Sequence, residues 1–219
     1  MTDAPITSAT GGRRAEAVSR ALRLEVITIA WMVVEAGGAI GAGLVARSTL
    51  LIAFGVDSVI ELMSAALLYR RLRLEAAGAD TCRVEATERT AGKMGGVLLF
   101  ALAAYVVAIS GFKLLHRGGA DESFIGLAIA AIAAAGMPIL AKAKVRAADQ
   151  IGSRALRADA METFTCGYMA WILLGGLGAN ALFHWWWLDG VAALVLVPLL
   201  IKEGREAYAG RCLCDHDTT

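Results

Sequence analysis

The residues best suited to chemistry in this sequence are acidic side chains that interrupt long apolar stretches. Asp57 and Glu61 stand four positions apart in the apolar segment 51–69. On a helix their carboxylates share one face, about 6 Å apart along the axis. An acidic residue at the centre of a bilayer costs about 2.5–3.5 kcal/mol on insertion scales. The pair must therefore be neutralised by a proton, a basic partner or a metal cation.

A second pair repeats this spacing in the segment 158–183. Glu162 and Cys166 are again four positions apart, and at 1.5 Å per residue Cys166 lies about 12 Å deep from the nearer helix end. Three carboxylates and one thiol near mid-membrane form a four-ligand set that suits a divalent metal. Simpler interpretations stay open: Asp57 and Glu61 as a structural pair, Glu162 at the membrane interface, and Cys166 as a small apolar residue.

Three further acidic residues lie within or beside apolar stretches. Glu35, at mid-depth of the first stretch, is a fifth ligand, a base behind the ligands, a proton carrier or a structural residue. Asp159 is expected to cap its helix or to pair with Arg157. Asp189 opens the last stretch, where an acid favours the helix dipole, and we interpret it as structural.

Basic residues that could neutralise these acids are almost absent from the apolar stretches. Lys113 lies at the end of its stretch, where its long side chain reaches the membrane surface. A proton or a cation therefore remains as the neutralising species. The C-terminal residues Cys212, Cys214 and His216, with two aspartates, form a further cluster that is either a loose metal ligand set or a solvated tail.

The composition is that of a membrane protein. The chain has 219 residues, of which 58% are hydrophobic and 19% charged, and its mean hydropathy is +0.61. Soluble domains carry about 45–50% apolar and about 25% charged residues, which argues strongly against a soluble enzyme. The formal net charge of +1 gives no basic excess for a nucleic-acid partner.

Six apolar stretches are long enough to cross a bilayer, which needs about 20 residues per helix. They predict an all-α integral membrane protein with six transmembrane helices. Of the 21 Lys and Arg residues, all but Arg47, Lys113 and Arg117 fall on the side of the two termini, which places both termini in the cytosol. The predicted spans are 24–45, 51–69, 94–115, 123–141, 158–183 and 185–201.

The predicted organisation is one membrane domain with short tails. Residues 1–23 are expected to form a cytosolic tail, 24–208 the six-helix domain, and 209–219 the C-terminal tail. The charged loop 70–93 is expected to extend the second and third helices. Two small-xxx-small pairs, Gly37/Gly41 and Gly92/Gly96, would allow helices to approach closely. We expect a bacterial inner (plasma) membrane location.

Three segments resemble the cation diffusion facilitator family. Segment 48–61 contains Asp57-Ser-x-x-Glu61, where that family shows Asp-Ser-x-x-Asp. Segment 156–166 contains Ala-Asp-Ala-x-Glu162-x-x-x-Cys166, where the family shows Ala-Asp-Ala-x-His-x-x-x-Asp. Segment 188–194 is similar to the start of the family's sixth span. The Glu and Cys replacements, and the lack of a cytosolic C-terminal domain, resemble the short branch that includes vesicular zinc transporters.

The resemblance implies proton-coupled export of a divalent transition metal from a homodimer. Asp57, Glu61, Glu162, Cys166 and Glu35 are then the metal-site candidates, with protons and the lipid bilayer as further partners and no resident cofactor. Zinc is the first expected substrate and ferrous iron the second, with manganese, cadmium and cobalt as alternatives. A metal-sensing membrane protein without transport is the other hypothesis. The motifs of phospholipid head-group transferases and intramembrane aspartyl proteases are not matched, so no enzyme is predicted.

Overall fold

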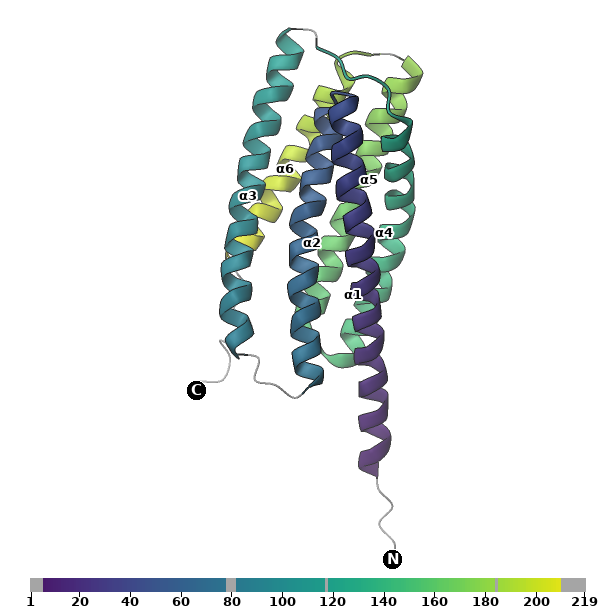
Figure 1. Cartoon of the computed structure of the whole chain (residues 1–219), viewed down its shortest axis with the longest axis vertical. Helices are drawn as coiled ribbons and strands as arrows, with labels where there is room; N and C mark the ends of the chain where they lie inside the picture. Colours follow the sequence, from purple (N-terminus) through teal and green to yellow (C-terminus); the bar gives the residue numbers. More distant parts are fainter. Residues whose placement is uncertain (1–5, 78–81, 117, 184, 210–219) are drawn as a thin grey trace, which may run out of the picture.

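The computed structural model is a bundle of six long helices, which confirms the all-α prediction for the residues that it describes (Figure 1). These residues are 6–77, 82–116, 118–183 and 185–209. No strand occurs among them. The helices are α1 (Ile6–Val45), α2 (Thr49–Ala76), α3 (Cys82–Leu115), α4 (Phe124–Ile151), α5 (Arg154–Phe183) and α6 (Leu188–Ala209).

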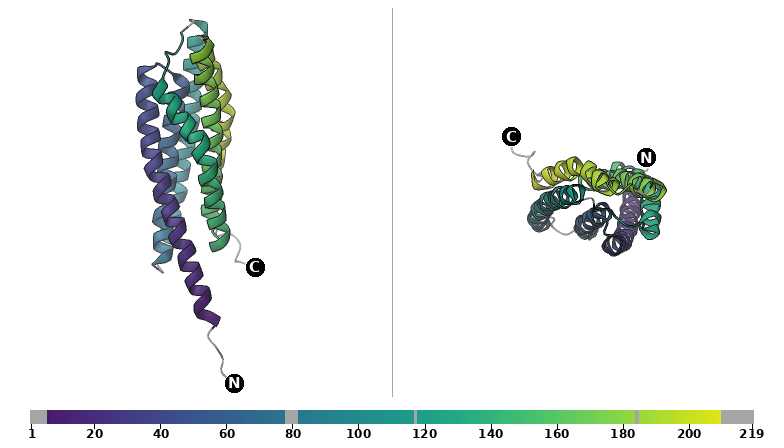
Figure 2. Two further views of the ribbon diagram at one scale, coloured as in Figure 1. Left: turned by 90° about the vertical axis from the view of Figure 1, so that its right-hand side faces the viewer. Right: turned by 90° about the horizontal axis from the view of Figure 1, so that it is seen from above.

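The helices run alternately up and down, so α1 begins and α6 ends at the same end of the bundle (Figure 1). We call this the terminal end and the other the distal end. Helix α1 packs on α2 and α4, α4 packs on α5, and α3 packs on α6. Viewed along the bundle, α3 and α6 lie together at one side, and α1 and α4 lie at the other (Figure 2). Helix α2 contacts α1, α3, α5 and α6, which gives its side chains access to the bundle interior.

The helices extend beyond the apolar stretches that predicted them. Helix α1 begins at Ile6, so much of the expected tail 1–23 continues the helix. Helices α2 and α3 reach Ala76 and Cys82, which confirms that the charged loop extends both. Hydropathy marks the part of a helix that matches the lipid core, whereas backbone hydrogen bonding continues past it.

Five of the described helices, α1 to α5, are long and apolar enough to cross a membrane. Helix α6 does not meet this criterion, because its uncharged stretch between Asp189 and Lys202 is shorter than the about 20 residues that a bilayer requires. The sixth span and the cytosolic side of the termini therefore stay predictions.

The bundle buries its contacts between helices and leaves large apolar side chains on its outside. Met32, Phe54, Met169 and Leu173 are among the fully buried core residues. Many large apolar residues on the outer faces are exposed, Phe112 and Trp171 among them. Such a surface is unusual for a soluble monomer and suits contact with lipid chains. The chain is accordingly an integral, multi-pass membrane protein.

The turn between α4 and α5 shows how local residues end and start these helices. Gly152 follows α4 with φ of 69°, a left-handed conformation that glycine adopts without a Cβ penalty, and its N–H donates to the carbonyl of Ala148. Ser153 then caps α5, because its Oγ accepts from the N–H of Leu156 at 3.3 Å. The tight turn sets α4 and α5 side by side.

Helices α3 and α6 approach closely at Gly96 and Gly204, of which the sequence analysis identified only Gly96. A Cβ added at Gly96 in α3 would lie 2.7 Å from the carbonyl oxygen of Gly204 in α6 and 2.8 Å from the backbone nitrogen of Tyr208. The expectation for Gly37 and Gly41 is wrong, because an added Cβ would meet no atom within 4 Å at either position. The side-chain position of Gly92 lies outside the described residues. A Gly-xxx-Gly spacing shows that close approach is permitted, but the partner helix decides whether it happens.

We expect Gly96→Ala to destabilise the protein by about 1–3 kcal/mol, because the new methyl group meets backbone atoms of α6 that cannot rotate away. Gly37→Ala is the matched control in α1, where the methyl has free space and helix propensity improves by up to about 1 kcal/mol. Unfolding of the purified protein in mixed micelles, followed by circular dichroism, measures both. Equal stability of the two variants would contradict a tight α3–α6 crossing.

Candidate functional site

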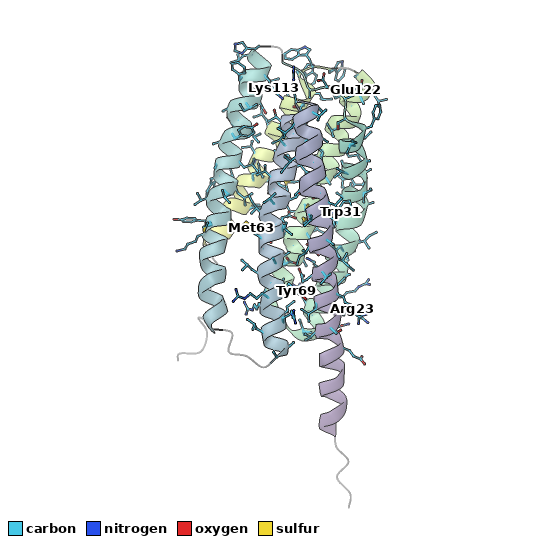
Figure 3. All side chains as sticks on the ribbon, viewed as in Figure 1. Arg23, Trp31, Met63, Tyr69, Lys113 and Glu122 are labelled. Carbon is cyan, nitrogen blue, oxygen red and sulfur yellow. The ribbon has the colours of Figure 1, made fainter. Side chains whose placement is uncertain are left out.

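Glu35 is the best-connected acid in the interior. Its side chain is fully buried in α1. Its Oε2 accepts a hydrogen bond from Trp31 Nε1 at 2.5 Å, and its Oε1 accepts from Ser58 Oγ at 2.7 Å and from Cys166 Sγ at 3.5 Å. Figure 3 shows Trp31 near the middle of the bundle. Three donors directed at one carboxyl group suit its ionised form, and they join α1, α2 and α5 at one point.

Asp57 lies next to this point with an oxygen that lacks a partner. Its side chain is 2% exposed, and its Oδ2 accepts no hydrogen bond from any residue that the structure describes. Glu203, Glu35 and Glu162 are among the charged groups that act on it electrostatically. A buried carboxylate oxygen without a donor is costly, so it requires a proton or a cation.

Glu61 lies one helical turn from Asp57 and, like Asp57, has a buried carboxylate oxygen without a hydrogen-bond partner among the described residues. In Glu61 this oxygen is Oε1. Of the charged groups that act on Glu61 electrostatically, Asp57 and Glu203 act most strongly. The predicted pair on one face of α2 is therefore present, with two oxygen atoms available for a ligand.

The two predicted residues of α5 differ in exposure. Cys166 is a free, fully buried thiol that donates to Glu35 and also interacts with Glu61 and Asp57. Glu162, one turn closer to the terminal end, is exposed and accepts a hydrogen bond from Ser64 Oγ of α2 at 3.1 Å. The structure thus gathers Glu35, Asp57, Glu61 and Cys166 in the interior and leaves Glu162 at the rim of this group.

The group is not a finished coordination shell. Among the described residues, no three His, Cys, Asp or Glu side chains are arranged so that they could hold a metal ion. Glu35 is engaged by three donors, whereas Asp57 and Glu61 each keep a free oxygen. A cation bound here would have to draw these side chains together, so the predicted ligand set remains a prediction.

Glu203 of α6 belongs to the same group and was missed by the sequence analysis, which ended the sixth span at residue 201. Its side chain is partly buried, and its Oε1 is a buried atom with no hydrogen-bond partner among the described residues. The available signal was the buried row Leu196, Leu200 and Gly204, which continues the helical spacing past residue 201. A fourth helix thus adds a carboxylate to the interior.

The expectation that the membrane segments contain almost no buried base is wrong. Lys144 is fully buried in α4, and its Nζ lies 2.5 Å from Asp159 Oδ2 and 3.3 Å from Glu25 Oε1. Asp159 therefore pairs with Lys144, whereas Arg157 pairs with Asp149 on the surface at 2.7 Å. The reason is that α4 continues to Ile151, so Lys144 lies two turns inside the helix rather than in a loop.

Asp189 has the structural role that was expected, with additional partners. It lies in the first turn of α6 and is 1% exposed. Its carboxylate accepts from Ser48 Oγ at 2.5 Å and from the N–H of Thr49 at 3.0 Å, and Lys113 Nζ lies 3.5 Å away. Asp189 therefore binds the start of α2 to the start of α6 at the distal end.

The cysteine-containing tail, Cys212, Cys214 and His216, lies outside the described residues.

The comparison with protein families gives one match. The sequence model of the cation efflux transmembrane domain matches residues 26–208, which covers most of the chain. A search among curated proteins finds no match. The matched region contains every residue of the interior group.

Proposed function

Because this chain belongs to the cation efflux family, whose members transport metal cations, we propose that it exports divalent transition-metal ions, zinc first, in exchange for protons. The observation that carries the proposal is the buried Asp57, whose Oδ2 has no hydrogen-bond partner in the described chain although other acids surround it. A divalent cation would neutralise two of these carboxylates at once. This is a family of transporters, in keeping with the prediction that the chain is not an enzyme.

We assign Asp57, Glu61 and Cys166 as ligands, with Glu162 as a ligand that enters from the rim. The contact between Cys166 Sγ and Glu35 Oε1 supports a route for the thiol proton. When the metal binds, the S–H bond breaks, the thiolate sulfur bonds to the metal, and the proton passes to the Glu35 carboxylate and from there to water. Metal affinity therefore falls as pH falls, because protons compete for the same oxygen and sulfur atoms.

The donor types favour zinc. Mixed carboxylate and thiolate ligands suit Zn²⁺ or Cd²⁺, whereas oxygen ligands alone suit Mn²⁺ or Fe²⁺. Ferrous iron is the second candidate, and cobalt is a further alternative. Helix α1 begins and helix α6 ends at the same end of the bundle, as a cytosolic location of both termini requires. A homodimer in a bacterial plasma membrane belongs to the same proposal.

Uptake into proteoliposomes that contain a metal-sensitive dye tests this function. Zinc, cadmium, manganese, cobalt and ferrous iron are supplied with and without a pH gradient, and protein-free liposomes are the control. We expect zinc entry that requires the gradient. Entry of every metal without regard to the gradient would contradict proton exchange. Zinc binding measured by calorimetry without any flux would instead favour a metal sensor.

A further inference from the structure

Three charged side chains are enclosed where α1, α4 and α5 meet near the terminal end. Glu25 and Lys144 are fully buried, and Asp159 is 7% exposed. Lys144 Nζ lies 2.5 Å from Asp159 Oδ2, but 3.3 and 3.4 Å from the two oxygens of Glu25. The ammonium group is therefore held mainly by Asp159, and Glu25 is its weaker partner.

The charges of this triad do not balance. Two carboxylates face one ammonium group, and Asp159 and Lys144 are the charged groups that act most strongly on Glu25. Helix α2, which packs on α1, contributes the buried Leu68 and Leu72 to the apolar cluster at this end of the bundle. Glu25 Oε1 also lacks a hydrogen-bond partner among the described residues. An uncompensated buried charge is strongly unfavourable, so one more positive charge is required.

A proton is the positive charge that fits. A metal ion beside Glu25 would lie against the Lys144 ammonium group, which already occupies the space between the two carboxylates. A proton on Glu25 Oε1 instead gives a neutral carboxylic acid beside a Lys144–Asp159 ion pair. We propose that Glu25 is a proton-binding site and that the triad is a latch that holds the terminal ends of α1, α4 and α5 together.

The latch is separate from the interior acid group. Glu25 precedes Glu35 by ten residues, which places it about 15 Å further along α1. At the same end of the bundle, α1, α2, α4 and α5 form a small apolar cluster that is separate from the main core: Ala21, Leu68, Leu72, Ala147, Ala148 and Leu156. Nothing in the latch requires a metal, so it stands independently of the proposed function.

Proton binding by Glu25 stabilises the closed arrangement of the triad. When the Glu25 carboxylic acid releases its proton to water, the enclosed triad changes from net zero to net −1 and the closed arrangement loses stability. Glu25 in an opened end is hydrated and ionises readily. Closure therefore binds a proton, and its stability is present at low pH and is lost as pH rises. Cys166 lies seven residues after Asp159 in α5, about 10 Å along the helix axis, so opening at this end would lead towards it.

Infrared spectroscopy of the metal-free protein tests the proton directly. We expect Glu25→Gln to remove the carbonyl stretch of one protonated carboxylic acid, and this loss identifies Glu25 as the protonated group. Glu16→Gln, at an exposed acid of the same helix, is the matched control and should leave that band unchanged. An unchanged band in Glu25→Gln would overturn the proposal. Gln mimics protonated Glu in shape and charge, so failure of Glu25→Gln to fold would overturn it as well.

Labelling of Cys166 tests the latch. With Cys82, Cys212 and Cys214 replaced by Ser, the maleimide rate in lipid nanodiscs is divided by the rate in unfolded protein at each pH, which removes the effect of thiolate formation. We expect this ratio to rise with pH in the Glu25 protein. In Glu25→Gln it should stay low, about tenfold lower at high pH, which corresponds to about 1.4 kcal/mol. Equal ratios in both proteins at every pH would overturn the latch.

Discussion

Asp57→Asn should lose metal transport by about 100-fold or more and yet leave the protein at least as stable as before. Replacing residues that merely support a metal ligand costs about 10–100-fold, so removal of a ligand costs no less. The side chain is 2% exposed and its Oδ2 has no hydrogen-bond partner in the described chain. Asn keeps the shape and removes a buried charge, which stabilises the metal-free state.

Zinc uptake into proteoliposomes and thermal unfolding of the metal-free protein measure the two effects. Asp149→Asn is the matched control, because this Asp is 55% exposed on α4 and pairs with a surface arginine. Its uptake should equal that of the unmodified protein. If Asp57→Asn transports zinc normally, the ligand assignment is wrong. If it loses transport only because it unfolds, Asp57 is a structural residue.

Lys144→Met should destabilise the protein by about 3–5 kcal/mol, the cost of removing one partner from a buried ion pair. The ammonium group touches Asp159 at 2.5 Å and Glu25 at 3.3 Å, and all three side chains are buried. Met retains much of the volume of the lysine stem. The loss therefore reports the Asp159 carboxylate, which is left without its base in the interior, and the lost contact with Glu25.

Lys142→Met provides the control for the lysine. Lys142 lies two residues earlier in α4 and is exposed, so its replacement should change the free energy of unfolding by less than about 0.5 kcal/mol. Denaturant titration in mixed micelles, followed by tryptophan fluorescence, measures both variants. Equal losses in the two variants would mean that the buried triad does not contribute to folding.

The parts of the site that could be predicted are those that depend on neighbouring sequence. Asp57 and Glu61 contrast with the apolar residues around them, and a spacing of four fixes their common face on α2. The same contrast and spacing identified Cys166, which lies beside Glu35 and the α2 pair. Helix type and order followed from the apolar stretches for the same reason.

The parts that could not be predicted depend on which helices meet. Lys144 stands in a polar stretch that resembles a loop, and only the length of α4 and the acids of α1 and α5 bury it. Glu203 follows a lysine at the end of an apolar stretch, and its place in the interior depends on the continuation of α6. Hydropathy assigns both to the membrane surface because it averages over a window and does not register packing partners.

The hydrogen bonds of Asp189 have a consequence for biosynthesis. Thr49 donates its N–H to a carboxylate that lies 140 residues later in the chain, and the N–H groups of a first helical turn have no partner within their own helix. During translation, the N–H of Thr49 and the hydroxyl of Ser48 therefore have no Asp189 carboxylate to bind until the start of α6 has been synthesised. In a nascent chain that stops before Asp189, the N–H of Thr49 and the hydroxyl of Ser48 lack this acceptor.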